Sequence, residues 1–159
     1  LLVAGNRRSI RLTGYDYSQS GYYFLTLCIK DKLQLLGRVE GELVKLSKVG
    51  KMVNDVLLEL KNRFEVGLDV FQIMPNHVHV VVGIKSGVDT GSRSVLSQCV
   101  GYLKMNSSKR SGIKLWQRNY FERIIRDEGE LWRIREYIKN NPKNWNRDIE
   151  NVGAHHDAP

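Results

Sequence analysis

The hydrophobic periodicity of this chain switches several times between a spacing of two and a spacing of three and four, and this feature constrains the fold most. Alternate side chains share one face of a strand, whereas side chains three and four apart share one face of a helix. Residues 22–30 are rich in aromatic and β-favouring types and predict a central strand. Residues 70–74 and 78–84 predict two more strands, joined through Pro75 and Asn76.

Two stripes of apolar residues at helical spacing predict helices. The first begins after Ser47 and consists of Val49, Met52, Val53, Val56, Leu57, Leu60 and Phe64. The second consists of Val95, Leu96, Cys99 and Leu103. Between the first strand and the first helix, residues 39–46 are flanked or interrupted by glycines, which favours a short hairpin or edge segment.

The last third of the chain predicts a strand and a third helix. Aromatic and branched residues in 114–125 indicate a strand running into a connection. Asp127 can cap the following helix, with Glu130 at its third position, and Pro142 ends it because the ring breaks the hydrogen-bond ladder. Its inner stripe is Leu131, Ile134 and Ile138. The order of elements predicts an α+β fold, an antiparallel sheet with helices packed on one face.

The length of 159 residues fits a single domain over 1–159. We expect a core over about residues 14–145, with flexible ends at 1–13 and 146–159. With 42% hydrophobic and 26% charged residues, the composition is that of a globular protein and excludes a disordered chain.

Positive charge is concentrated in the second half of the chain. The formal net charge is +8, and residues 102–147 contribute 12 Lys+Arg against 5 Asp+Glu, which is +7 of that total. Such a surface favours a polyanion, above all nucleic acid. Aromatic residues interleave with these charges, either to stack on unpaired bases or as part of the core; they are Trp116, Tyr120, Trp132 and Trp145.

Several other classes of protein are excluded by what the sequence lacks. No segment approaches the roughly 20 apolar residues of a membrane span. Cys28 and Cys99 lie in apolar periodic segments and predict small buried hydrophobes, neither a disulfide framework nor a zinc site. The motifs of zincins, P-loop proteins, dinucleotide-binding domains and α/β-hydrolases are absent. We therefore expect a cytoplasmic protein with no membrane partner.

Two histidines are the sharpest local feature of the sequence. His77 and His79 project from one side of the predicted strand, about 7 Å apart at their Cα atoms, while Val78 and Val80 face the other side. Two neutral imidazoles placed in this way can share a divalent metal ion, with a third ligand supplied from elsewhere. Taken alone, the pair is more often two histidines partly exposed on a strand than a metal site.

Tyr137 and Asn141 form the second local feature. Because they are four residues apart, they lie on one face of the last helix, next to its inner stripe. A phenol and an amide oxygen could therefore face one site. The alternative is a tyrosine packed on the sheet at the helix border and an asparagine that caps the helix.

Three segments, in order, resemble the REP-associated tyrosine transposases, a branch of the single-tyrosine HUH superfamily of IS200-like transposases. They are 74–79, which holds the motif of histidine, hydrophobic residue and histidine, 116–126, and 135–145. The resemblance covers about residues 14–145. It implies a ferredoxin-like, RRM-like core with a C-terminal helix that carries the tyrosine.

The resemblance also implies a reaction. His77, His79 and Asn141 would bind Mg²⁺ or Mn²⁺, and Tyr137 would attack single-stranded, hairpin-bearing DNA of the repetitive palindromic type, leaving a 5′-phosphotyrosine. The protein would act as a monomer or a homodimer on the bacterial nucleoid. Our candidates for contacts with the DNA backbone are Lys104, Lys109, Arg110, Arg118, Arg123 and Arg126.

Two other functions remain open from the sequence. One is a non-catalytic nucleic-acid-binding protein on the same RRM-like core, although the aromatic motif of such modules is absent. The other is a metal-dependent phosphodiesterase that uses the histidines but no covalent tyrosine.

Overall fold

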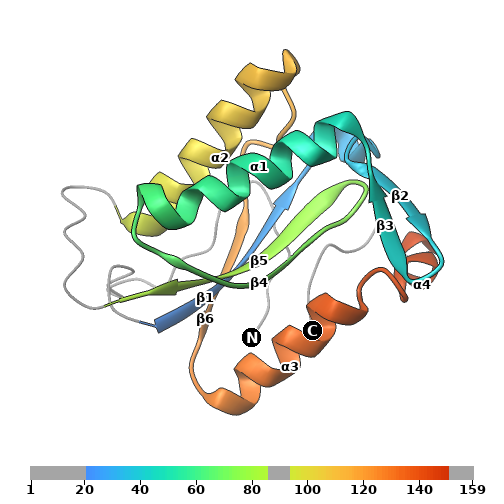
Figure 1. Cartoon of the computed structure of the whole chain (residues 1–159). Coiled ribbons are helices and arrows are strands. Elements are labelled where there is room, and N and C mark those ends of the chain that lie inside the picture. The colour runs from blue at the N-terminus through green and yellow to red at the C-terminus, as the bar shows by residue number, and fades with distance from the viewer. Residues whose placement is uncertain (1–20, 86–93, 151–159) are drawn as a thin grey trace.

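The computed structural model describes residues 21–85 and 94–150, and its centre is a four-stranded antiparallel sheet (Figure 1). The strands are ordered β4-β5-β1-β6, so β1 is internal, as its apolar sequence predicts. Their bounds are Gly21–Cys28 for β1, Gly67–Ile73 for β4, His77–Ile84 for β5 and Phe121–Ile125 for β6. Neighbouring strands run antiparallel throughout.

Helices cover both faces of this sheet. Figure 1 shows α1 (Lys48–Arg63) and α2 (Val95–Ser111) together on one face and α3 (Glu128–Asn140) on the other. A hairpin of β2 (Gly37–Glu40) and β3 (Leu43–Leu46) forms a separate small sheet. The single-turn helix η1 (Lys30–Lys32) follows β1, and α4 (Trp145–Glu150) follows α3. The predicted α+β class is confirmed, but the helices expected on one face of the sheet are divided, because α3 packs on the opposite face from α1 and α2.

The alternation of side chains along the strands divides the core into two layers. Tyr23, Leu25 and Leu27 of β1 pack in the larger layer, beneath α1 and α2. The residues between them face α3, where a smaller layer forms. That layer contains Phe24, Val81, Phe121, Ile125, Leu131, Ile134 and Ile138. His77 and His79 pair across the strands with Cys28 and Thr26, and they therefore lie on the α3 face.

The predicted helix starts are confirmed by their caps. The Ser47 hydroxyl accepts a hydrogen bond from the Gly50 N–H at 3.0 Å. The Asp127 carboxylate accepts one from the Glu130 N–H at 2.7 Å. At the end of α2, Gly112 adopts the left-handed conformation with φ 71°, which glycine accommodates without steric cost.

One sequence prediction about a strand needs correction. The strand predicted over 114–125 is wrong in its first half, because the connection comes first and β6 contains only Phe121–Ile125. Trp116 makes a single bridge to Ile29 instead. Residues 145–150, which overlap the end expected to be flexible, form α4 after a turn at Pro142. The predicted flexible segments 1–13 and 151–159 lie outside the described residues.

The described part of the chain contains no candidate for a membrane-spanning helix. None of its helices has the length and apolar character needed to cross a bilayer. Cys99 is buried as predicted, and burial raises the pKa of its thiol to about 12, while Cys28 is half-buried.

Candidate active site

Four of the predicted site residues converge on the α3 face of the sheet. His77 and His79 of β5 lie with ring centroids 4.6 Å apart. The ring of Tyr137, from α3, lies 5.4 Å from that of His79. Asn141, directly after α3, places its Oδ1 atom 3.3 Å from Nε2 of His77. Residues separated by about sixty positions in the sequence therefore meet at one end of the sheet.

The orientation of each imidazole is set by a further polar side chain. Nδ1 of His77 lies 2.7 Å from Oδ1 of Asn76, and Nδ1 of His79 lies 2.8 Å from the hydroxyl of Thr26. Because an amide oxygen only accepts, Nδ1 of His77 carries the proton in this contact. Both imidazoles can then present a lone pair on Nε2, which is the arrangement typical of metal-ligating histidines.

The chemistry of this donor set fits a divalent cation. With Nδ1 of His77 protonated, its Nε2 lone pair and the Asn141 amide oxygen, 3.3 Å apart, form a pair of acceptors to which a cation can bind. Imidazole nitrogen and amide oxygen together suit ions of intermediate hardness such as Mn²⁺. Across residues 21–85 and 94–150, no cluster of three or more His, Cys, Asp or Glu side chains offers another metal site.

The surroundings of these residues are largely closed to solvent. His77, His79 and Asn141 are buried, and Tyr137 is half-buried. The Tyr137 ring meets Phe24 edge-on, with centroids 6.5 Å apart. On the other side of the site, Trp145 of α4 lies 6.2 Å from the His77 ring. Tyr137 is thus held by apolar neighbours while it borders the histidine pair.

Three of the six basic residues predicted to hold DNA make contacts within the fold. Lys104 donates to the carbonyl oxygens of residues 117, 118 and 119 at 2.8, 3.3 and 3.2 Å. Burial lowers the pKa of Lys104 to about 8. Arg110 pairs with Glu59 at 2.7 Å, and Arg123 with Glu130 at 2.6 Å. The other three are exposed and form no ion pair with the described residues; they are Lys109, Arg118 and Arg126.

The aromatic residues of the basic segment divide between core and surface. Trp116 and Trp145 are buried, and the Trp116 indole N–H donates to the Ser107 hydroxyl at 2.8 Å. Tyr120 is half-buried against the larger core layer. Trp132, on the outer side of α3, is 62% exposed, so it has the most ring surface available for stacking.

Thr26 and Asn76 are site residues that the sequence analysis did not assign. Thr26 is the single polar residue in an otherwise apolar and aromatic stretch of β1, and that contrast is a signal for a functional contact. Asn76 directly precedes the histidine pair, where its role could have been suspected from the neighbouring motif.

Comparisons with known proteins show the relatives of this chain. Residues 18–141 match the family described as transposase IS200 like. A protein of Haemophilus influenzae described as uncharacterized is 35% identical over 165 residues, which cover 90% of this chain and 92% of the relative. A second protein of that organism, whose name assigns it to the REP-associated tyrosine transposases, is 21% identical over 80% of this chain and 73% of its own.

A solved structure shares the fold. It is a REP-associated tyrosine transposase bound to a REP hairpin, with a TM-score of 0.66 and 19% sequence identity. The match covers 85% of this chain and 74% of that structure.

Proposed function

This chain belongs to the IS200-like transposase family, and we propose that it cleaves and rejoins single-stranded, hairpin-bearing DNA through a covalent bond to Tyr137. The observation that carries this proposal is the contact between two elements. Tyr137 from α3 lies beside His79 on the sheet face where His77 and Asn141 also meet. A nucleophile and a set of metal-binding groups within one site are the parts that a phosphoryl transfer requires.

Tyr137 would act as the nucleophile. Its hydroxyl loses its proton and the oxygen forms a bond to the phosphorus, while the bond from phosphorus to the 3′ oxygen breaks and that oxygen takes up a proton. A 5′-phosphotyrosine and a free 3′-hydroxyl result. Because the phosphodiester is exchanged rather than hydrolysed, another 3′-hydroxyl can reverse the step and join two strands. Packing of the Tyr137 ring against Phe24 would restrict its position and so favour attack.

His77, His79 and Asn141 would hold Mg²⁺ or Mn²⁺. When bound, such an ion polarises the scissile phosphate and stabilises the negative charge that develops on its oxygens. Asn76 and Thr26 would keep the imidazoles in the orientation that this ion needs.

A hairpin-bearing strand is the substrate that the comparisons favour. The structure with the same fold contains a REP hairpin, and the exposed side chains of Lys109, Arg118 and Arg126 would contact phosphates on such a strand. The formal charge of +8 is consistent with a polyanionic partner.

The proposal is tested by incubating hairpin-bearing single-stranded DNA with the protein and Mn²⁺, followed by a denaturing gel. We expect a shifted band that protease removes. Tyr137→Phe should abolish it while DNA affinity stays within about a few-fold, because only the nucleophilic oxygen is lost. Tyr120→Phe is the matched control, since Tyr120 packs against the opposite core layer. An adduct that survives in Tyr137→Phe and vanishes in Tyr120→Phe would show that Tyr120, and not Tyr137, is the nucleophile.

The same assay separates the alternatives. A metal chelator, or the double change His77→Ala with His79→Ala, should remove the adduct. Hydrolysed DNA without any adduct would instead support a metal-dependent phosphodiesterase. Binding without cleavage, at every metal concentration, would support a nucleic-acid-binding protein.

A further inference from the structure

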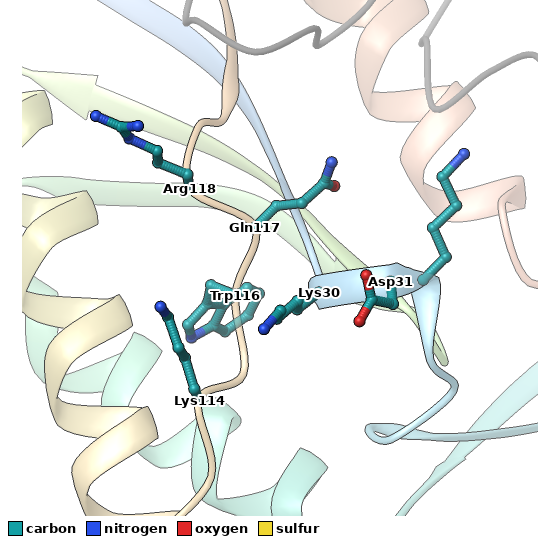
Figure 2. Close-up of a pocket in the computed structure, with 7 residues that line it drawn as sticks. Lys30, Asp31, Lys114, Trp116, Gln117 and Arg118 are labelled. Atoms are coloured by element: carbon teal, nitrogen blue, oxygen red, sulfur yellow. The ribbon is translucent and has the colours of Figure 1, made fainter.

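A second feature of the molecule lies just beyond the end of β1. It is a cavity of about 820 Å³, called here the Lys30 pocket (Figure 2). Four of its lining residues are cationic and one is a carboxylate, so the pocket carries net positive charge. The lining consists of Lys30, Asp31, Lys32, Lys114, Trp116, Gln117 and Arg118. Figure 2 shows that these side chains come from two separate segments of the chain.

Backbone hydrogen bonds hold the two segments together. The Lys30 N–H donates to the carbonyl of Leu115 at 2.7 Å, and the Gln117 N–H donates to the carbonyl of Cys28 at 2.9 Å. The half-buried ammonium of Lys104 donates hydrogen bonds to the carbonyls of residues 117–119. The wall of the pocket is therefore fixed before any ligand binds, with the side chains of Gln117 and Arg118 lining it.

The backbone at the rim of the pocket is strained. Asp31 and Lys32 have φ values of 57° and 58°, in the left-handed region that non-glycine residues rarely adopt. Aspartate tolerates this conformation better than most residues, but lysine does not. Strain of this kind is concentrated at ligand-binding sites, where the surrounding structure holds it in place.

The Lys30 pocket borders the candidate active site. Cys28, at the end of β1, is paired with His77. The next residue, Ile29, donates its N–H to the carbonyl of Asn76 at 2.9 Å, and the Asn76 side chain in turn orients His77. Only Ile29 therefore lies between Lys30, where the lining of the pocket begins, and Cys28, which pairs with His77. A strand whose phosphate reached Tyr137 and that continued along this end of the sheet would meet the rim of the pocket.

We infer that the Lys30 pocket binds one nucleotide of the single-stranded DNA that flanks the scissile phosphate. Lys30, Lys114 and Arg118 contact the phosphates, and Asp31 and Gln117 contact the edge of the base. A carboxylate accepts hydrogen bonds from the exocyclic amino groups of cytosine, adenine and guanine. Thymine has no amino group and offers a carboxylate only its N3–H, so the pocket favours the three bases that carry an amino group over thymine. This inference rests on the proposed DNA substrate but needs no chemical step.

The phosphate contacts are tested by fluorescence anisotropy with a labelled hairpin-bearing strand, in Tyr137→Phe protein without divalent metal. Lys30→Ala and Arg118→Ala should each reduce the slope of log affinity against log salt by about 0.7, the value for one lost contact to a single strand. Lys51→Ala removes the same charge from an exposed position of α1, outside the pocket and apart from the residues proposed to contact DNA, and is the matched control. Equal losses in all three variants would show a diffuse charge effect and overturn the inference.

The base contact is tested with strands that carry each of the four bases at each flanking position in turn. At one position, thymine should weaken binding to the otherwise unchanged protein roughly fivefold or more, as expected for one lost base contact. Asp31→Asn keeps the side-chain shape and tolerates the positive φ, and it should reduce this discrimination. An unchanged base preference in Asp31→Asn would contradict the assignment. Loss of the adduct in the gel assay, with both binding results intact, would refute the proposed chemistry alone.

Discussion

Thr26 and Asn76 determine how the two imidazoles of the candidate site are presented. Each is buried, and each contributes a polar group that would be costly to leave unpaired in a largely apolar layer. Their contacts with Nδ1 of His79 and His77 satisfy that requirement and fix the direction of Nε2. The site therefore depends on residues that would touch neither metal nor DNA.

We predict that Thr26→Val raises the Mn²⁺ concentration needed for half-maximal adduct formation by roughly 10–100-fold, since it removes the partner of His79 and keeps the side-chain volume. Thr26→Ser retains a hydroxyl and should need nearly the same Mn²⁺ concentration as the unchanged protein. Thermal unfolding of both variants checks that the fold is intact. Equal metal requirements in the Val and Ser variants would show that the hydroxyl does not orient the ligand.

The sequence was informative for the main site residues and uninformative for their supports. Alternation in β5 places His77 and His79 on one face, and the four-residue spacing places Tyr137 near Asn141. Thr26 could not be linked to His79 because a single sequence does not show the register between β1 and β5. Asn141 adopts the helical conformation although it precedes proline, contrary to the usual preference, and so it reaches His77.

At the scale of elements, α3 is tied to the edge strand of the sheet by one ion pair. Arg135 donates to Asp69 from Nε at 2.7 Å and from a second guanidinium nitrogen at 2.5 Å. The pairing of β4 with β5 shifts register between Leu68 and Val70, which is where Asp69 lies. This irregularity in β4 coincides with the residue that reaches α3. Because Tyr137 is two residues from Arg135, the pair can position the tyrosine.

We predict that Asp69→Asn slows adduct formation in a single turnover by about tenfold, because small shifts of a nucleophile have large effects on rate. Its effect on the free energy of unfolding should stay below about 1 kcal/mol, since Arg135 is more than a third exposed. Glu136→Gln, which alters a looser pair with Lys139 on the same helix, is the control and should leave the rate unchanged. A rate loss no larger in Asp69→Asn than in this control would contradict the positioning role.

Helices and strands with a clear periodic pattern of apolar residues were predicted well. Segments whose structure depends on contacts with other parts of the chain were not. The stripe from Val49 to Phe64 required a helix, and α1 has nearly those bounds. Residues 114–120 have the aromatic composition of a strand, but the Trp116 indole bonds to Ser107 of α2, and its backbone makes an isolated bridge to Ile29, just after β1. Composition cannot show that contact. Helix α4 is short and lacks a full apolar stripe, so periodicity could not reveal it.

At the scale of the whole molecule, α1 and α2 form a layer joined by a polar network at its surface. The Glu59 carboxylate of α1 accepts hydrogen bonds from Arg110 at 2.7 and 3.0 Å and from the Tyr102 hydroxyl at 2.6 Å, both on α2. The guanidinium of Arg63 lies 4.8 Å from the centroid of the Tyr102 ring. These groups are partly exposed, and salt will weaken their attraction. Part of the positive charge of the molecule is thereby neutralised inside the helical layer, away from the α3 face.

This network predicts how stability depends on pH. The hydrogen bond from Arg110, followed by that from Tyr102, lowers the pKa of Glu59 from 4.5 to about 2. Between those values the unfolded chain binds more protons at this position than the folded protein does. The stabilisation is therefore fully present above about pH 5 and is lost as the pH falls toward 2.

Glu59→Gln should flatten the fall of unfolding free energy between about pH 5 and pH 2, because the amide has no proton to take up. Tyr102→Phe removes one hydrogen bond to the carboxylate and should give an intermediate slope. Urea unfolding followed by circular dichroism at a series of pH values measures both, and high salt should reduce the difference between the variants and the unchanged protein. If all three proteins lost stability in parallel across this range, the acid sensitivity would have to arise from other carboxylates, and the link between α1 and α2 would contribute nothing to it.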